Sequence, residues 1–207
     1  MSVKKLGFLF LLLTTFNFNL FAHGCTGNAC VEIETDQEIL NSGKVSYEFY
    51  LIDEKISKVL TEDDLEIQHE KKLHMFVYDE ALKEFQHVHP TFNGTFFTVD
   101  LEFKKNGNYT VFAQGLLTSG EEFAAPTKLK VTGGEAANDI INLGEVLKGE
   151  DGNTVIEFKA KNLVAGKMAM PILVFSRKDG SAPELTDWLG AKAHVVATQF
   201  GSETLLH

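Results

Sequence analysis

The stretch KVSYEFYLI, residues 44–52, decides the fold class of this chain. Hydrophobic residues occupy every second position in it, with polar or less hydrophobic neighbours between them. This two-residue period is typical of a β-strand with one buried face. The residues of the hydrophobic face are Val45, Tyr47, Phe49 and Leu51.

Further β-rich runs follow, and turns such as Asn93-Gly94 and Asn106-Gly107 separate them. No stretch has a sustained helical period, and residues 61–68 have room for one helical turn at most. Short strands at this spacing predict an all-β fold, an antiparallel sandwich. The predicted strands lie within residues 72–79, 84–90, 94–103, 107–117 and 126–133.

The chain is predicted to contain two tandem β modules. Residues 35–132 form the first, and the small polar stretch GGEAAND at 133–139 is a predicted linker. β-rich runs return after it, so residues 140–207 are predicted to form a second, shorter sandwich-like module. The runs in question are 154–163, 170–180 and 193–200.

The N-terminus predicts export. Residues 1–22 combine a basic start, an apolar run and the small residue Ala22, as in a cleaved signal peptide. Cleavage there leaves the segment 23–34, with His23 as an N-terminus able to chelate a metal through its amine and imidazole. In a second interpretation AHGC is a poor lipobox and Cys25 is lipidated, which anchors a periplasmic or secreted protein to a membrane. Cys25 and Cys30 most simply form a small disulfide loop, with a soft-metal pair as the alternative.

The formal net charge of −10 bears on the partners of the chain. Acidity of this size argues against nucleic acid or an anionic membrane surface as a partner. It is compatible with attraction of cations, although most acidic surfaces are only solvated.

Histidines recur at one interval in the two modules. HMFVYDEALKEFQH, residues 74–87, and HVVATQFGSETLLH, residues 194–207, each begin and end with His. If each segment is a hairpin with a short loop, its two histidines face each other with Cβ atoms about 4.5–5.5 Å apart. Two imidazoles at that separation can share one ion through metal–nitrogen bonds of about 2.0–2.1 Å.

His89 lies on the same strand face as His87, because strand side chains alternate. Pro90 then ends the strand, since it has no N–H to donate. His74, His87 and His89 are therefore predicted to form a ligand set for copper, zinc or nickel. The alternative is structural: a strand histidine is often partly buried and bonded to a backbone carbonyl.

The histidine pattern resembles that of bacterial exported proteins with tandem β modules. Their first module carries H-hydrophobic-V-x-x-x-L-x-x-F-x-H-x-HP, which here reads LHMFVYDEALKEFQHVHP. Their second carries YLGA-x-x-H-x-V followed by LHVHP, which here reads DWLGAKAHVVATQFGSETLLH. This sequence departs from the pattern at His207, where the family continues with a further His and Pro.

The resemblance covers roughly residues 65–207 and implies periplasmic handling of copper or another heavy metal. It carries metal-ligand status onto His74, His87, His89, His194 and His207. We therefore expect an exported metal-binding protein, with copper first and zinc as the alternative, that serves transport, buffering or resistance. A membrane metal transporter or another metal carrier is the expected partner.

Other ligands and functions stay open. His69 is a candidate fourth ligand from a loop, or a solvated loop residue. Met168 and Met170 offer thioethers suited to Cu(I), but alternating Met residues, like Met75, more often pack in a core. No catalytic triad, nucleophile elbow or phosphate-binding loop is legible. A mononuclear oxygenase or hydrolase, or an adhesion sandwich without metal, are the competing functions.

Overall fold

The computed structural model describes residues 29–136, 147–160, 163–164, 166–198 and 204–206. In this part of the chain strands dominate, and the helical element is the single 3-10 turn Glu62–Asp64. Both the all-β class and the single short turn within residues 61–68 are thus confirmed. Among the described residues, no helix has the length and apolar character needed to cross a membrane.

One sheet of the sandwich contains the stretch that decided the fold class. In β3 (Gly43–Asp53) the side chains of Tyr47, Phe49 and Leu51 are buried, as the alternation predicted. Its partners in the sheet are β1 (Val31–Glu34), β4 (Lys58–Leu60), β9 (Phe97–Phe103) and β8 (Thr91–Phe92). Because β1 pairs with β3, the sandwich begins before residue 35, where the sequence analysis placed its start.

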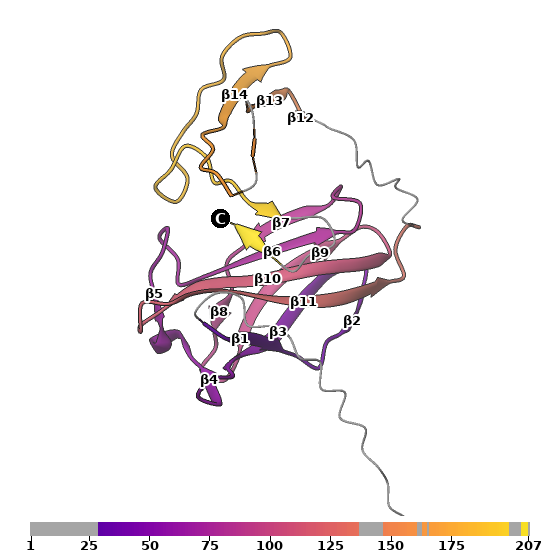
Figure 1. Ribbon diagram of the computed structural model, residues 1–207. Helices are drawn as coiled ribbons and strands as arrows, with labels where there is room; N and C mark the ends of the chain where they lie inside the picture. Colours follow the sequence, from indigo (N-terminus) through magenta and orange to yellow (C-terminus); the bar gives the residue numbers. More distant parts are fainter. Residues whose placement is uncertain (1–28, 137–146, 161–162, 165, 199–203, 207) are drawn as a thin grey trace, which may run out of the picture.

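The second sheet, shown in Figure 1, contains His74 in β6 and His87 in β7, and His89 follows directly after β7. Its strand order is β2 (Ile39–Asn41), β11 (Glu122–Thr132), β10 (Gly107–Leu117), β6 (Leu73–Asp79) and β7 (Phe85–Val88), with β5 (Leu65–Glu66) beside β10. All of its pairings are antiparallel except that of β2 with β11, which is parallel.

The main core lies between the two sheets. Aromatic side chains from β3, β9 and β10 fill it, and full burial of each such side chain stabilises the fold by about 1.5–3 kcal/mol. Met75 also packs there, fully buried, as predicted. The largest aromatic members are Tyr47, Tyr109, Phe49, Phe97 and Phe103.

The strands β6 and β10 are buried on both faces. Their outward side chains Phe76 and Phe112 form a second cluster with Leu205, which comes from the far end of the chain. Leu205 belongs to a two-stranded hairpin of β15 (Ala197–Thr198) and β16 (Leu205–Leu206). This hairpin, in yellow in Figure 1, lies against the outer face of the histidine-bearing sheet.

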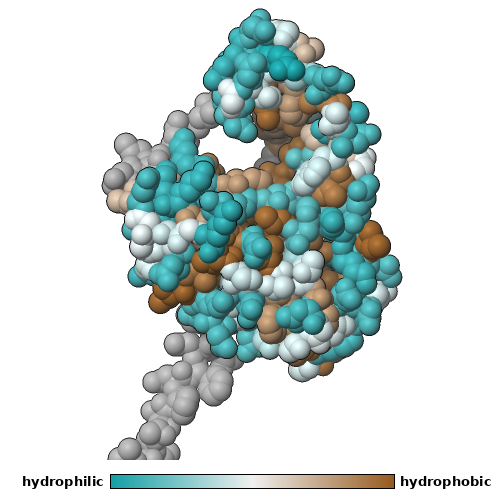
Figure 2. Space-filling model, turned by 180° about the vertical axis from the view of Figure 1, so that it is seen from behind, coloured by the Kyte–Doolittle hydropathy of each residue, from teal (hydrophilic) through white to brown (hydrophobic). Residues whose placement is uncertain are grey.

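The remaining strands form a separate small sheet, β12 (Lys148–Asp151), β13 (Thr154–Lys159) and β14 (Ile172–Arg177). In Figure 2 this part of the second module stands above the sandwich, with an opening between them. Met168 and Met170 precede β14 and are 95% and 88% exposed, so the prediction that they pack in a core is wrong.

The start of the predicted linker is attached to the first module. Asn106 Oδ1 accepts a hydrogen bond from the Gly134 backbone N–H, and Glu135 bridges to Lys105. A Cβ at position 134 would lie 2.7 Å from the Lys104 carbonyl oxygen, so only glycine fits this close approach. Residues 137–139 lie outside the described part of the chain.

Candidate metal centre

The β6–β7 hairpin positions the three histidines of the first module. Its register pairs Phe76 with His87 and Met75 with Val88, so the next pair along is His74 with His89. The sequence analysis expected His74 to face His87 directly. That expectation is wrong, because the residue that faces His87 is Phe76, two positions after His74. The centre of the hairpin loop lies one residue later in the chain than the expected pairing requires. A shift of two keeps side chains on the same face, so all three imidazoles still lie on the outer side of the sheet.

The three imidazoles converge. One ring nitrogen from each of His74, His87 and His89 lies within 4.8 Å of the others. The ring centroids are 5.4 Å apart for His74 and His87, 5.0 Å for His74 and His89, and 4.9 Å for His87 and His89. Three imidazoles bound tetrahedrally to one ion, with metal–nitrogen bonds of about 2.0–2.1 Å, place their centroids roughly 5 Å apart. The spacing therefore matches that of a shared ion.

A backbone carbonyl fixes the protonation of His74, which is fully buried. Its Nε2 lies 2.9 Å from the carbonyl oxygen of Gln68. A carbonyl only accepts, so Nε2 carries the proton and Nδ1 holds the lone pair. Burial lowers the pKa of the His74 imidazole, and the carbonyl opposes this shift only in part. The ring is therefore a neutral ligand with Nδ1 directed at its neighbours.

The Nδ1 lone pair of His74 faces His87. The distance from His74 Nδ1 to His87 Nε2 is 3.1 Å, and a hydrogen bond of this length requires the proton to be on the His87 nitrogen. Two nitrogens bound to one tetrahedral ion lie roughly 3.3 Å apart. An ion held between these atoms would take the place of the proton with little movement of either ring.

His89 provides the clearest sign of a missing partner. Its Nε2 is buried and has no hydrogen-bond partner, although a buried polar atom left unpaired costs about 1–3 kcal/mol. Burial, and to a smaller extent the neighbouring His74 and Lys71, lower the pKa of the His89 imidazole to about 4. A neutral ring with a buried, unpaired nitrogen fits a metal ligand, so the residues present suit a borderline ion such as copper or zinc.

The second module brings His194 to the same place. Its ring centroid is 6.3 Å from that of His87 and 5.2 Å from that of His69. Trp188 lies between the modules, with its ring 5.2 Å from His87, 5.8 Å from His89 and 5.5 Å from His194. Two further candidates, His69 of the first module and His194 of the second, thus border the cluster of three, together with one aromatic ring that the sequence analysis did not single out.

His69 lies at the tip of a tight turn. Both His69 and Glu70 have left-handed φ angles, 49° and 65°, and Gln68 bridges to Lys71 across them. This is the geometry of a two-residue turn with positive φ at both central positions. His69 is exposed, and its centroid lies 6.1 Å from that of His74, so it borders the cluster without being one of the three converging ligands.

The repeat seen in the sequence has a structural counterpart. The turn Trp188–Ala191 copies the turn at Gln68 and Lys71, with its bridge and with positive φ at Leu189 and Gly190. His194 Nε2 lies 3.0 Å from the carbonyl oxygen of Trp188, which is six residues earlier in the chain. His74 Nε2 has the same relation to Gln68, also six residues earlier, at a distance of 2.9 Å. The sequence signal was the WLGA-x-x-H stretch, but the anchoring carbonyls carry no side-chain signature.

The hairpins that follow these turns also correspond. In the first module Val77 of β6 pairs with Gln86, and in the second Ala197 of β15 pairs with Leu206. Val77 and Ala197 are 120 positions apart in the chain, and so are Gln86 and Leu206. The counterparts Tyr78 and Thr198 meet, with their hydroxyl oxygens 3.2 Å apart. His207, the fifth predicted ligand, lies outside the described residues.

Three N-terminal predictions also fall outside the described part of the chain: the signal peptide at residues 1–22, His23, and lipidation of Cys25. Cys30 is described, and it is buried and disulfide-bonded. This favours the disulfide over the soft-metal pair at the Cys30 end.

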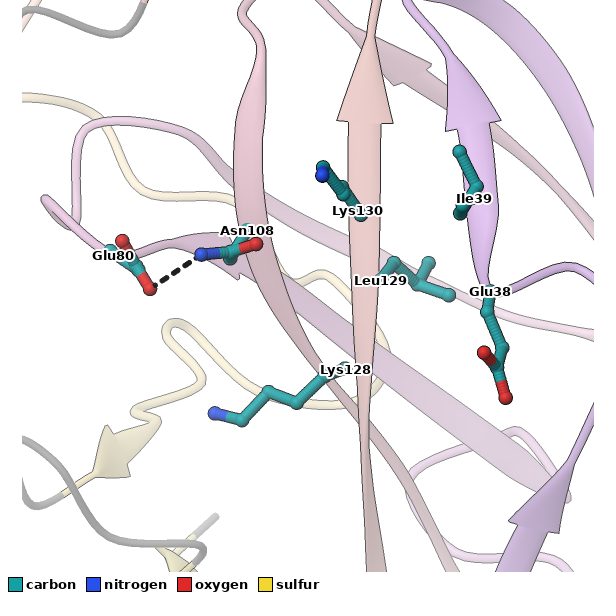
Figure 3. Close-up of a pocket in the computed structure, with 7 residues that line it drawn as sticks. All are labelled: Glu38, Ile39, Glu80, Asn108, Lys128, Leu129 and Lys130. Carbon is teal, nitrogen blue, oxygen red and sulfur yellow. Dashed lines mark hydrogen bonds between the residues drawn. The ribbon is translucent and has the colours of Figure 1, made fainter.

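A pocket at the β2 edge of the same sheet is lined by two glutamates and two lysines beside apolar residues, and by no histidine (Figure 3). Asn108 donates a hydrogen bond of 3.0 Å to Glu80 there, and Lys128 donates one of 2.8 Å to Thr110. Its charges are of both signs and several are already paired, so the pocket offers no ligand set comparable with that of the imidazoles.

These features define an all-β sandwich protein with a histidine cluster on the outer face of one sheet. Residues 28–133 match the family model of DUF8832, a domain of unknown function. The match covers slightly more than half of the chain, so the protein belongs to this family. No curated protein matches the chain.

Proposed function

We propose that this protein is an exported transition-metal-binding protein. His74, His87 and His89 hold one ion, with copper as the first candidate and zinc as the alternative. The protein serves in transport, buffering or resistance, and it exchanges its ion with a membrane metal transporter or another metal carrier. Export rests on the signal-like residues 1–22.

The observation that carries the proposal is the buried, unpaired Nε2 of His89 beside two converging imidazoles. A structural histidine normally has its ring nitrogens bonded to protein groups or water. His74 shows how a ligand is prepared, because the Gln68 carbonyl holds its Nε2–H and leaves Nδ1 to the cluster. A carbonyl behind the ligand orients the ring and raises its basicity, as in known metal sites.

The choice of metal follows from the donor set. Neutral imidazoles suit copper, zinc and nickel, whereas calcium and magnesium prefer oxygen ligands. For one site, copper binds more tightly than zinc in the general order of divalent ions. The exposed thioethers of Met168 and Met170 are not needed for this site.

The test is calorimetric titration of the full chain with Cu(II) and with Zn(II). The unaltered protein is expected to bind one ion per intact triad. Replacing His87→Ala and His89→Ala together removes two of three ligands, and we expect the affinity to fall by about a hundredfold or more.

Lys83→Ala is the matched control, because Lys83 is an exposed residue of the same hairpin. It is expected to bind the ion as the unaltered protein does. An unchanged affinity in the double variant would remove the basis of the proposal, since the triad would then have no part in metal binding.

A further inference from the structure

We propose that His194 supplies a fourth imidazole to the ion, so that one metal binds both modules at once. This inference rests on the proposed function, because it names an additional ligand of the same site. It turns the cluster from a site within the first module into a site between modules, in which metal binding and docking of the second module are coupled.

The anchoring of His194 supports a ligand role. Its Nε2 lies 3.0 Å from the Trp188 carbonyl oxygen, which accepts only, so Nε2 carries the proton and Nδ1 carries the lone pair. His74 has the same anchoring from Gln68. Each of the two turns therefore leaves the Nδ1 lone pair of its histidine, His74 or His194, available as a ligand.

The distances leave a short step to coordination. The His194 centroid is 6.3 Å from that of His87, against roughly 5 Å expected for two imidazoles on one tetrahedral ion. The turns whose carbonyls anchor His74 and His194 approach each other, because a Cβ added at Gly190 would lie 3.7 Å from the Glu70 carboxylate. A closure of roughly 1.3 Å between these two rings would bring His194 to that separation from His87.

Apolar and hydroxyl contacts join the hairpin to the sheet. Those between described residues include the apolar cluster around Leu205, with Val196 packed against it, and the hydroxyl contact of Tyr78 with Thr198. Trp188 bridges the two sides but is 50% exposed. A metal–imidazole bond from His194 is then a substantial addition to this contact, and by linkage the docked state binds the ion more tightly.

His69 is the competing fourth ligand. Its ring is also close, but it extends from an exposed turn of the first module. A ligand from that module would not connect the two parts of the chain. The two assignments differ in which single substitution weakens binding.

The first experiment measures Zn(II) affinity of the full chain by competition with a chromophoric chelator. His194→Ala is expected to weaken binding about 10–100-fold while keeping one ion per chain. Val195→Ala, an exposed neighbour of the same segment, is the matched control and is expected to leave the affinity unchanged. Weakening by His69→Ala and none by His194→Ala would overturn the inference.

The second experiment compares amide hydrogen exchange with and without Zn(II). In the unaltered protein, Zn(II) is expected to slow exchange both in β6 and β7 and in residues 188–198. In His194→Ala it is expected to slow exchange in β6 and β7 alone. If Zn(II) slows exchange in β6 and β7 of the unaltered protein but leaves residues 188–198 unchanged, the inference fails and the proposed function stands. If Zn(II) does not bind at all, both fail.

Discussion

Gln68 contributes only a backbone oxygen to the site, yet that oxygen decides how His74 presents itself. Because the carbonyl takes the Nε2–H, the lone pair of His74 is on Nδ1, 3.1 Å from His87. His89 lacks such a partner, and its buried Nε2 is left unpaired. At the scale of single residues, the site is therefore a cluster of imidazoles in which burial lowers the pKa of His74 and of His89 and so favours their neutral form.

The lowered pKa of His89 predicts a pH dependence of stability in the metal-free protein. The imidazole titrates near 6.5 in the unfolded chain and at about 4 in the folded protein. Between these values the unfolded state binds more protons, so the free energy of unfolding decreases as the pH falls from about 6.5 to about 4. Urea unfolding in the presence of EDTA at several pH values measures this loss.

His89→Phe is the control for that prediction, because phenylalanine has a ring of similar size and does not titrate. It is expected to reduce the loss of stability between pH 6.5 and about 4. It also removes the unpaired nitrogen, so we expect the metal-free variant to be about 1 kcal/mol more stable at pH 7. An equally steep pH dependence in the variant would show that His89 does not cause it.

The β6–β7 hairpin sets which histidines face each other. The spacing of its apolar and His residues predicted the two strands and the shared face correctly. The register was not predictable, because the loop carries its left-handed φ of 55° at Leu82. Positive φ normally favours glycine or asparagine, so a leucine gives no sequence signal for the centre of the turn.

Asp79 holds this loop in place. Its carboxylate accepts hydrogen bonds from the backbone N–H groups of Lys83 (2.6 Å) and Glu84 (2.9 Å). Asp79→Ala removes both bonds, and we expect a loss of about 1–3 kcal/mol in the free energy of unfolding. We also expect weaker Zn(II) binding, since the loop no longer fixes the strand that carries His87 and His89.

Asp79→Asn is the matched control, because the amide oxygen can still accept from both N–H groups. It is expected to retain most of the stability and of the Zn(II) affinity. Chemical unfolding and metal titration of the two variants together decide the question. If Asp79→Ala bound Zn(II) as tightly as the unaltered protein, the loop would have no role in placing the ligands.

Across the whole molecule, local patterns predicted the class and the strands but not how the modules meet. Alternation placed Tyr47 and Phe49 in the core, where they are buried. The same reasoning failed for Met168 and Met170, which are 95% and 88% exposed. The approach of His194 to the first module is a tertiary contact, and a sequence period carries no information about it.

The contact between the modules also explains why both faces of β6 are buried. A strand with one solvated face alternates in burial, whereas β6 is buried at nearly every position. The outer cluster of Phe76, Phe112 and Leu205 accounts for this. The histidines thus lie beside an apolar patch, where low access of water strengthens metal–ligand interactions.

The central claim is that the imidazoles of His74, His87 and His89 share one ion. X-ray absorption spectroscopy of the full chain loaded with one equivalent of Cu(II) tests it most directly. The account predicts at least three imidazole nitrogens around the copper, reduced by two in the protein with His87→Ala and His89→Ala. A first shell made mainly of oxygen, or one left unchanged by the two substitutions, would contradict it.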